Sequence, residues 1–294
     1  MKNDFSSNSF IINKRMTSNL TGLDRQTTDA FYTAGHVALD CINSFIETIQ
    51  PKKTDIIIEP SAGAGAFSLR LAESYQNVVA FDIDPRHPSI QQQNFLDYSF
   101  DVDDTKEAHV VGNPPFGRQS SLAKKFIQHA SKFAVSISFI LPKSFKKESM
   151  QKVFPLQFHL VKECEIPVNS FLINNKEHDV PCIFQIWKKF PTERQIQPPE
   201  EPLCFTFCKK EEDPDIALRR VGVNAGKVIT ANLSSLSHQS HYFILKRNIT
   251  KRVLEKLFKD LIFQHDNTVG PKSISKQELI LQLNLLFKKQ KNIL

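Results

Sequence analysis

Short, uninterrupted apolar runs recur between residues 56 and 187, and segments with the helical spacing of apolar residues separate them. Such runs are typical of parallel strands, because helices cover a parallel sheet on both faces. We expect strands at Ile56–Glu59, Val78–Asp82, Ala108–Val111, Val135–Leu141, Phe158–Glu163 and Cys182–Trp187. We expect helices at His36–Ile49, Phe67–Ser74 and Ser120–Lys132. This alternation predicts an α/β fold with a doubly wound, mostly parallel sheet.

A proline-rich segment, Pro191–Pro202, interrupts this pattern and is the clearest linker in the chain. Beyond it we expect a small α+β extension, with strands at Leu203–Phe207 and His241–Leu245 and helices at Lys251–Phe263 and Ser275–Phe287. The sequence therefore predicts three parts: a flexible tail at 1–20, a main domain at 21–190 and a basic C-terminal portion at 203–294.

The composition is that of a soluble, folded protein. Apolar residues make up 40% of the chain and 24 residues are Phe, which favours a packed core over disorder. No apolar run approaches the roughly 18 residues that span a bilayer, and the first residues lack the apolar segment of a secretory signal. We expect neither membrane association nor export. Five cysteines scattered in apolar runs indicate reduced thiols, as in the cytoplasm or nucleus.

Cys204, Cys208, His238 and His241 have the spacing of a loose zinc site. If residues 204–208 form a strand, the two sulfur atoms stand about 13 Å apart, at ~3.3 Å per residue. Zinc–sulfur bonds of about 2.3 Å cannot bridge that separation. We therefore predict that these residues are structural and that the chain has no metal site.

The net charge of +7 is concentrated near the C-terminus. Between His241 and Leu294 there are eleven Lys and Arg against four Asp and Glu, so this part alone carries an excess of seven. Clustered positive charge favours a polyanionic partner, because each neutralised phosphate releases counterions. A solvated helix face is the alternative interpretation.

A glycine-rich turn, residues 61–65, joins the strand that ends at Glu59 to the next helix. Glycine lets the backbone approach a ligand closely and directs N–H groups at an acidic moiety. Ala66-Phe67 replaces the Lys-Ser/Thr ending of a P-loop, which disfavours nucleoside triphosphate hydrolysis. Asp82, at the end of the next strand, is placed to bind ribose hydroxyls. By itself this pattern also fits a dinucleotide site or another Rossmann-like protein.

Asn113-Pro114-Pro115-Phe116 follows the expected strand at Ala108–Val111. A residue before proline avoids the α region, so the segment should leave the strand extended. The Asn113 amide and the Pro114 carbonyl can then both accept hydrogen bonds from an amino group. These acceptors would stabilise positive charge that develops on an exocyclic nitrogen during methyl transfer. Phe116 would stack on the base, and Pro115 would stiffen the turn.

The order of these parts resembles that of the class I S-adenosylmethionine-dependent methyltransferases with an Asn/Asp-Pro-Pro-Tyr/Phe motif, and among them the N6-adenine DNA methyltransferases. The resemblance covers about Leu20–Leu286 and is strongest over Asp55–Phe116. It implies a Rossmann-like methyltransferase sheet, S-adenosylmethionine as cofactor, and adenine N6 as acceptor. The implied catalytic residues are Asn113, Pro114, Pro115 and Phe116.

The resemblance also implies a set of cofactor-binding residues: Tyr32, Thr33, Glu59, Ser61, Gly63, Gly65, Asp82, Ile83, Asn94 and Phe95. The members from Glu59 to Gly65 would surround the amino-acid end of the cofactor, Asp82 would hold the ribose, and Ile83 would pack on the adenine. Tyr32 and Thr33 would close over the donor, with a helix-capping turn as the alternative. Asn94 stands where the family usually has Asp; its carbonyl oxygen can accept the same bond, and Phe95 would stack.

The expected partner is nucleic acid, DNA in preference to RNA. Flipping an adenine out of a duplex costs a few kcal/mol, which cationic contacts with phosphates offset. The residues expected to make them are Arg118, Lys143, Lys146, Lys147, Arg219 and Arg220, with a solvated surface as the alternative. An RNA adenine, a protein glutamine amide and a catalytically silent nucleic-acid-binding module remain as other interpretations. The sequence does not indicate an oligomeric state.

Overall fold

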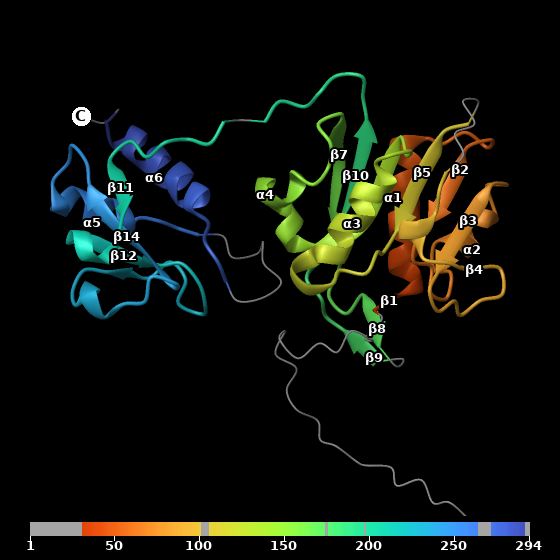
Figure 1. Cartoon of the computed structure of the whole chain (residues 1–294), viewed down its shortest axis with the longest axis horizontal. Helices are drawn as coiled ribbons and strands as arrows, with labels where there is room; N and C mark the ends of the chain where they lie inside the picture. Colours follow the sequence, from red (N-terminus) through yellow and green to blue (C-terminus); the bar gives the residue numbers. More distant parts are fainter. Residues whose placement is uncertain (1–30, 101–105, 174–175, 197, 264–271, 292–294) are drawn as a thin grey trace, which may run out of the picture.

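The computed structural model describes residues 31–100, 106–173, 176–196, 198–263 and 272–291, so the predicted tail at 1–20 lies outside the described residues. The largest element is a seven-stranded sheet with the order β4-β3-β2-β5-β6-β10-β7 (Figure 1). Its strands are β2 (Ile56–Glu59), β3 (Val78–Asp82), β4 (Gln91–Gln92), β5 (Ala108–Gly112), β6 (Ser136–Pro142), β7 (Phe158–Glu165) and β10 (Cys182–Lys189). The neighbouring strands β4, β3, β2, β5 and β6 pair in parallel, whereas β10 is antiparallel to both β6 and β7. The predicted doubly wound, mostly parallel Rossmann-like sheet is confirmed.

Helices cover both faces of this sheet. They are α1 (Gly35–Ile49), α2 (Ser68–Ala72), α3 (Ser121–Ala130) and α4 (Glu148–Gln151). Within β2, Ile57 belongs to the core cluster that includes α1, and Ile58 belongs to the cluster that includes α3. Both side chains are fully buried, because successive residues of a strand point to opposite faces. Burial on both faces is the reason for the uninterrupted apolar runs.

The direction of the winding reverses between β2 and β5. The chain runs outward from β2 to β3 and β4 on one side, and from β5 to β6 on the other. Because β2 and β5 are parallel neighbours, their carboxyl ends meet at one edge of the sheet. Ligands of open α/β sheets bind in the crevice outside such a switch point. The glycine turn after β2 and Asn113 after β5 therefore flank the expected binding crevice.

A small antiparallel sheet lies beside this edge. It consists of β1 (Tyr32–Thr33), β8 (Phe171–Ile173) and β9 (Lys176–His178), in the order β1-β8-β9. The alternative of a helix-capping turn at Tyr32–Thr33 is wrong, since these residues form a strand and the N-cap of α1 is Ala34, which has no side-chain capping bond. Strands β8 and β9 were not predicted, because three-residue strands leave no periodic pattern in a sequence.

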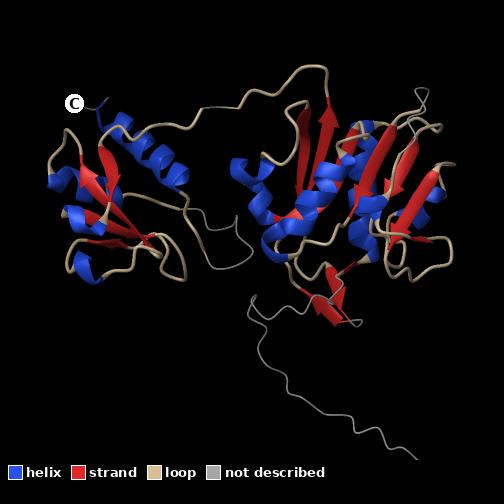
Figure 2. Cartoon of the chain, in the orientation of Figure 1, coloured by secondary structure: helices blue, strands red, loops and turns tan. Residues whose placement is uncertain are grey.

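The C-terminal part has a sheet and a core of its own. Its sheet has the order β11-β14-β12-β13 and is packed against two helices (Figure 2). The elements are β11 (Phe205–Cys208), β12 (Ile216–Arg219), β13 (Val228–Ile229), β14 (His241–Lys246), α5 (Lys251–Lys259) and α6 (Lys276–Lys291). A capping box precedes α6: Ser275 Oγ accepts the Glu278 N–H at 3.1 Å, and the Ser275 N–H donates to Glu278 Oε2 at 3.3 Å.

Short 3-10 helices connect several of these elements. In the described residues they are η1 (Phe95–Asp97), η2 (Arg118–Ser120), η3 (Lys143–Lys146), η4 (Lys210–Glu212) and η5 (Leu233–Ser235).

All five cysteines are free thiols. Cys204 is fully buried in the C-terminal core, and Cys208 ends β11. Burial raises the pKa of both thiols to about 11, so both stay protonated at neutral pH. Within the described residues, the quartet with His238 and His241 does not converge as a set of metal ligands.

Candidate active site

The two loops at the switch point are joined directly. Ser61, in the turn after β2, donates a hydrogen bond from its hydroxyl to the backbone carbonyl of Asn113 after β5, with an O–O distance of 3.1 Å. The residues expected to bind the cofactor and those expected to bind the acceptor therefore lie side by side, although 52 positions separate them in the sequence.

The glycine turn is shaped by a missing Cβ. Gly63 has φ of 53°, and a Cβ at this position would come within 2.8 Å of the Tyr32 ring. The N–H of Gly63 donates to Asp82 Oδ2 at 2.7 Å, and that of Gly65 donates to the Ala62 carbonyl at 2.7 Å. Both glycine N–H groups are thus used inside the protein, contrary to the expectation that they point at a ligand. At this turn the backbone of Gly63 therefore lies close to the ring of Tyr32.

Glu59 lies buried at the end of β2, directly before the glycine turn. Its side chain is 2% exposed, and its Oε2 accepts the Ser68 N–H at the start of α2, with an O–N distance of 2.7 Å. Burial raises the pKa of this carboxyl group to about 7, because the charged form loses its hydration, and the nearby Asp82 acts in the same direction. A cationic ligand would stabilise the ionised form of this carboxyl group.

We expect the pKa of Glu59 to make the free energy of unfolding depend on pH. A folded-state pKa of about 7, above the ordinary 4.5, favours the protonated form. The stabilisation is therefore complete below about pH 4.5 and is lost as the pH rises through about 7. Between about pH 5 and about pH 8 the wild type should lose about 2 to 3 kcal/mol more stability than Glu59→Gln, which cannot ionise. Urea denaturation of both proteins at the two pH values measures the difference, and parallel losses would exclude the shifted pKa.

Asp82 and Ile83 lie at the end of β3, next to the turn. The two carboxylate oxygens of Asp82 accept the N–H groups of Gly63 and Asp84, at 2.7 and 2.8 Å. Each oxygen keeps a further lone pair that can accept a ligand hydroxyl. Ile83 is 72% exposed, so its side chain is accessible to a ligand. Its exposure is the property required of a residue that packs on a ligand ring.

The prediction that the Phe95 ring stacks on a ligand is wrong. The side chain is 1% exposed and packs on Phe126 under α3, with ring centroids 5.3 Å apart. It is therefore a core residue and cannot stack on a ligand. Asn94 caps η1 by accepting the Leu96 N–H at 3.1 Å and donating to Asp97 at 2.9 Å. Its carbonyl oxygen keeps one lone pair, so the role predicted for Asn94 stays a prediction.

Asn113 is held by its amide nitrogen. Nδ2 donates to the Phe31 carbonyl at 3.3 Å and to Thr33 Oγ1 at 3.2 Å. The other end of the same amide, Oδ1, is buried and accepts no hydrogen bond from the described residues. A buried acceptor without a partner is the exception in folded proteins. Phe31 and Thr33 thus orient the Asn113 side chain, and its oxygen has no donor among the described residues.

The rest of the motif forms the wall of the site. Pro114 is buried, Pro115 is exposed, and Phe116 is half-buried against both core clusters of the main sheet. In the described part of the chain the Pro114 carbonyl accepts no hydrogen bond. The segment that follows is bent sharply, with positive φ at Gly117, Gln119 and Ser120.

Arg86 is a neighbour of the site that sequence reasoning missed. Its backbone N–H donates to the Gly63 carbonyl at 2.8 Å. The ion pair with Asp84, 2.6 Å between Nη2 and Oδ2, raises the pKa of the guanidinium group. The only signal in the sequence was its position directly after Asp84-Pro85.

The cationic residues predicted near the motif are not equally available. Lys143 forms an ion pair with Glu165 at 3.0 Å, and Lys146 pairs with Glu163 and Glu165, which lowers the pKa of Glu165. Lys147 donates to the Ser273 carbonyl at 3.4 Å, a contact with the C-terminal part. Arg118, by contrast, is exposed directly after the motif. The charges of Lys143 and Lys146 are therefore largely neutralised.

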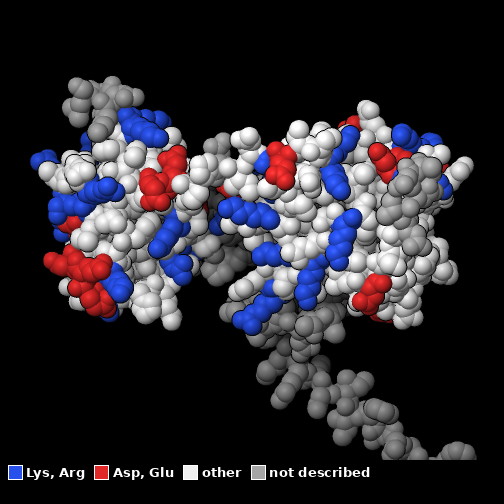
Figure 3. Space-filling model, turned by 45° about the horizontal axis from the view of Figure 1, so that its top comes forward, with Lys and Arg blue, Asp and Glu red and all other residues white. Residues whose placement is uncertain are grey.

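In the C-terminal part, Arg219 and Arg220 use one guanidinium N–H each on nearby carbonyls, those of Val221 and Gln239, both at 3.0 Å. Figure 3 shows Lys and Arg side chains spread over both parts of the chain, with Asp and Glu gathered in a few clusters.

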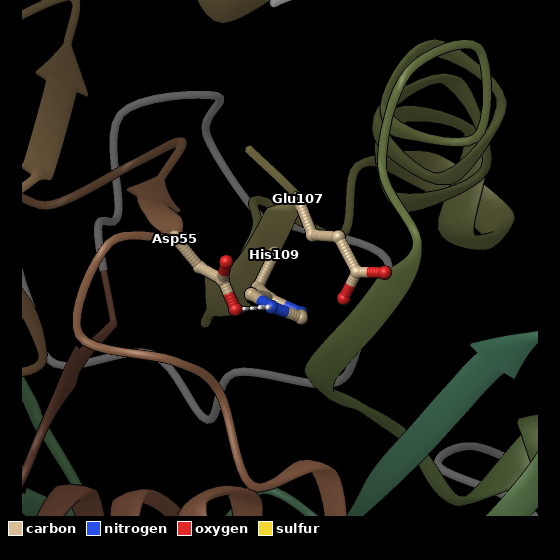
Figure 4. Close-up of side chains that lie close together, drawn as sticks. All are labelled: Asp55, Glu107 and His109. Carbon is tan, nitrogen blue, oxygen red and sulfur yellow. Dashed lines mark hydrogen bonds and ion pairs between the residues drawn. The ribbon is translucent and has the colours of Figure 1, made fainter. Parts of the chain in front are cut away.

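A separate group of titratable residues lies at the opposite edge of the sheet (Figure 4). Asp55 precedes β2 and His109 lies in β5; both are 2% exposed and lie 3.3 Å apart, between Nε2 and Oδ2. His109 Nδ1 is 2.8 Å from the Ser136 hydroxyl in β6. Burial lowers the pKa of His109, so the neutral ring uses both nitrogens to tie three strands together. Glu107 completes a trio whose ligand atoms lie within 4.8 Å of one another, but both nitrogens of His109 are already hydrogen-bonded.

Two curated proteins are similar to this chain, and no protein-family model matches it. A mitochondrial ribosomal RNA small subunit methyltransferase of Arabidopsis thaliana is 29% identical over 118 residues, covering 36% of this chain and 31% of that protein. An rRNA adenine N-6-methyltransferase of Limosilactobacillus reuteri is 24% identical over 153 residues, covering 48% and 62%. The chain thus spans less than two thirds of the length of each relative.

Among solved structures, a magnesium protoporphyrin IX methyltransferase from Synechocystis PCC 6803 with bound SAM shares 12% identity at a TM-score of 0.40, over 53% of this chain and 80% of that one. The curated relatives are methyltransferases by name. The chain therefore resembles methyltransferases, as its motifs predicted. Among the described residues, no helix combines the length and the apolar character needed to cross a bilayer.

Proposed function

We propose that this chain transfers a methyl group from S-adenosylmethionine to the exocyclic N6 amino group of an adenine in RNA. One observation carries the proposal: Asn113 Oδ1 is buried without a partner in the described part of the chain, while Nδ2 of the same amide is held by Phe31 and Thr33. An amino group is the donor that this oxygen lacks. The Ser61–Asn113 hydrogen bond keeps that oxygen beside the turn at residues 61–65.

The residues of the crevice fit S-adenosylmethionine. Glu59, with its raised pKa, suits the cationic amino group of the amino-acid end. Asp82 offers acceptors for the ribose hydroxyls, and exposed Ile83 offers a surface for the adenine. Tyr32 lies over Gly63, where its ring covers the amino-acid end. When bound, the cofactor supplies an electrophilic methyl group on a sulfonium.

The chain contributes orientation and electrostatic stabilisation. The Asn113 oxygen and the Pro114 carbonyl accept the two N–H groups of the target amine, which turns its lone pair toward the methyl carbon. As the N–C bond forms and the S–C bond breaks, positive charge develops on nitrogen, and both hydrogen bonds strengthen. The excess proton then leaves to water. Phe116 stacks on the adenine ring.

The choice of RNA rests on the relatives. Both curated proteins that match are rRNA methyltransferases by name, whereas the motif alone favoured DNA. The excess of positive charge in the C-terminal part supports a nucleic acid over a protein glutamine or a small molecule. DNA is the second candidate, because the resemblance of the Asn-Pro-Pro-Phe motif to the N6-adenine DNA methyltransferases favours it.

Mass spectrometry of nucleosides tests this function. Purified wild type and Asn113→Ala are incubated with S-adenosylmethionine and, separately, with total RNA, genomic DNA and a glutamine-containing peptide. We expect N6-methyladenosine to appear in RNA with the wild type and to fall to background with the variant. N6-methyldeoxyadenosine in DNA alone would replace RNA by DNA as the substrate. Methylated peptide, or no transfer to any substrate, would refute the proposal.

A further inference from the structure

A cavity of about 490 Å³ opens in the C-terminal part, between the end of β11, the start of β14 and the start of α6. This volume lies in the range of small-ligand sites, about 300–1,000 Å³. The lining combines rings with cations, chiefly Phe207, Tyr242, Arg220 and Lys276, and its acidic residue is Glu211. The cavity therefore suits a ligand with both a flat and an anionic part.

Two cations are fixed on aromatic rings at this cavity. The Lys276 ammonium lies 4.6 Å from the centroid of Phe207, and the Arg220 guanidinium lies 5.5 Å from that of Tyr242. The two rings meet edge to face at 5.4 Å. Neither cation forms an ion pair with a described residue, unlike Lys143 and Lys146. Their charge is thus oriented by the rings and available to a ligand.

His241 supplies a second, independent sign of a ligand. It lines the same cavity and is 5% exposed. Its Nδ1 lies 3.1 Å from the Ser237 carbonyl and 3.1 Å from the Ser240 hydroxyl. The carbonyl can only accept, and the tautomer that donates to it from Nδ1 has Nε2 as an acceptor. Its Nε2 is buried and has no partner among the described residues. An imidazole oriented in this way leaves one acceptor without a donor, which is rare unless a ligand provides it.

We propose that this cavity binds an unpaired nucleotide of the substrate strand, at a position outside the methylated adenine. Arg220 and Lys276 contact its phosphate. The base stacks on the guanidinium plane of Arg220, whose Cζ lies 5.5 Å from the centroid of the Tyr242 ring, and an amino group of the base donates to His241 Nε2. The nucleotide is unpaired because stacking and edge contacts both require a base outside a duplex. This inference rests on the proposed function for the identity of the strand.

Fluorescence anisotropy with a short fluorescein-labelled single-stranded RNA tests the site on the full chain. We expect Arg220→Ala and Lys276→Ala each to weaken binding about tenfold, and each to reduce the slope of log affinity against log salt by about 0.7, the value for one phosphate of a single strand. Arg220→Lys keeps the positive charge but lacks the planar guanidinium group. It should therefore restore the wild-type slope of log affinity against log salt, but less than half of the lost affinity on a logarithmic scale. The matched control is Lys227→Ala, an exposed lysine of the same part that does not line the cavity.

The outcomes separate this inference from the proposed function. If the wild type methylates RNA while Arg220→Ala and Lys276→Ala bind RNA as tightly as Lys227→Ala, the nucleotide site is refuted and the proposed function stands. If Arg220→Lys restores full affinity, stacking on the guanidinium plane is refuted. If the wild type methylates nothing but the two variants still bind RNA more weakly than Lys227→Ala, the nucleotide site stands and the proposed function fails. Circular dichroism confirms that each variant is folded.

Discussion

Replacing Asn113 by alanine should reduce kcat about 100- to 1,000-fold and leave the affinity for S-adenosylmethionine within about threefold of wild type. The loss corresponds to one preorganised hydrogen bond that strengthens in the transition state. Cofactor affinity should be largely spared because Asn113 Oδ1 is assigned to the target amine and not to the cofactor. Single-turnover methyl transfer gives the rate, and titration calorimetry gives the affinity.

Two further variants make this result specific. Asn77→Ala removes an amide whose nitrogen donates to the exposed Thr54 carbonyl, at the amino ends of β2 and β3 and thus at the end of the sheet opposite the site, and should leave kcat unchanged. Thr33→Val removes one of the two bonds that hold the Asn113 amide, so it should lower kcat by about tenfold, the loss of one modest hydrogen bond. A kcat of Asn113→Ala equal to that of wild type would end the catalytic assignment of this residue.

A valine at position 63 should abolish measurable cofactor binding. The Cβ alone would lie 2.8 Å from the Tyr32 ring, and φ of 53° is strained for any residue with a Cβ. A β-branched side chain adds further atoms in the same space. We expect the Kd for S-adenosylmethionine to rise at least about 100-fold, equivalent to ~2.7 kcal/mol. Titration calorimetry measures it.

The matched control is Gly35→Ala. Its added Cβ also comes within 2.8 Å of another atom, but that atom is the end of the flexible Arg70 side chain. Gly35 begins helix α1, where alanine is the better helix former. This variant should therefore bind S-adenosylmethionine as the wild type does. If Gly63→Val also retains wild-type affinity, the turn is not part of the cofactor site.

Much of the main fold followed from the sequence because its strands are buried on both faces. An apolar run such as Ile56–Ile58 has no stable exposed alternative, so the positions of β2, β3 and β6 were predicted to within one or two residues. The same holds for the adjacency of the glycine turn and Asn113, since parallel strands bring their carboxyl ends to one edge. These features depend on local patterns and on a topology that the alternation of strand and helix restricts.

Contacts between segments that are distant in the chain could not be predicted from the sequence. That Glu163 and Glu165 neutralise Lys143 and Lys146 depends on antiparallel β10, which lies between β6 and β7 and joins β7 to the sheet. The burial of Phe95 depends on the position of α3, and the cavity at Phe207 and Tyr242 depends on the packing of α6 on the C-terminal sheet.

The sequence by itself determined the residue types at the site: an amide before two prolines, glycines in a turn, and carboxylates at strand ends. Only the tertiary structure decided which of their atoms are left for a ligand. The Asn113 oxygen is available because the short strand β1, which pairs with β8, occupies the nitrogen of the same amide. The physical reason is that hydrogen bonds are saturable: a group whose protons or lone pairs all have partners in the fold is not offered to a substrate, and partners 80 residues apart are set by packing.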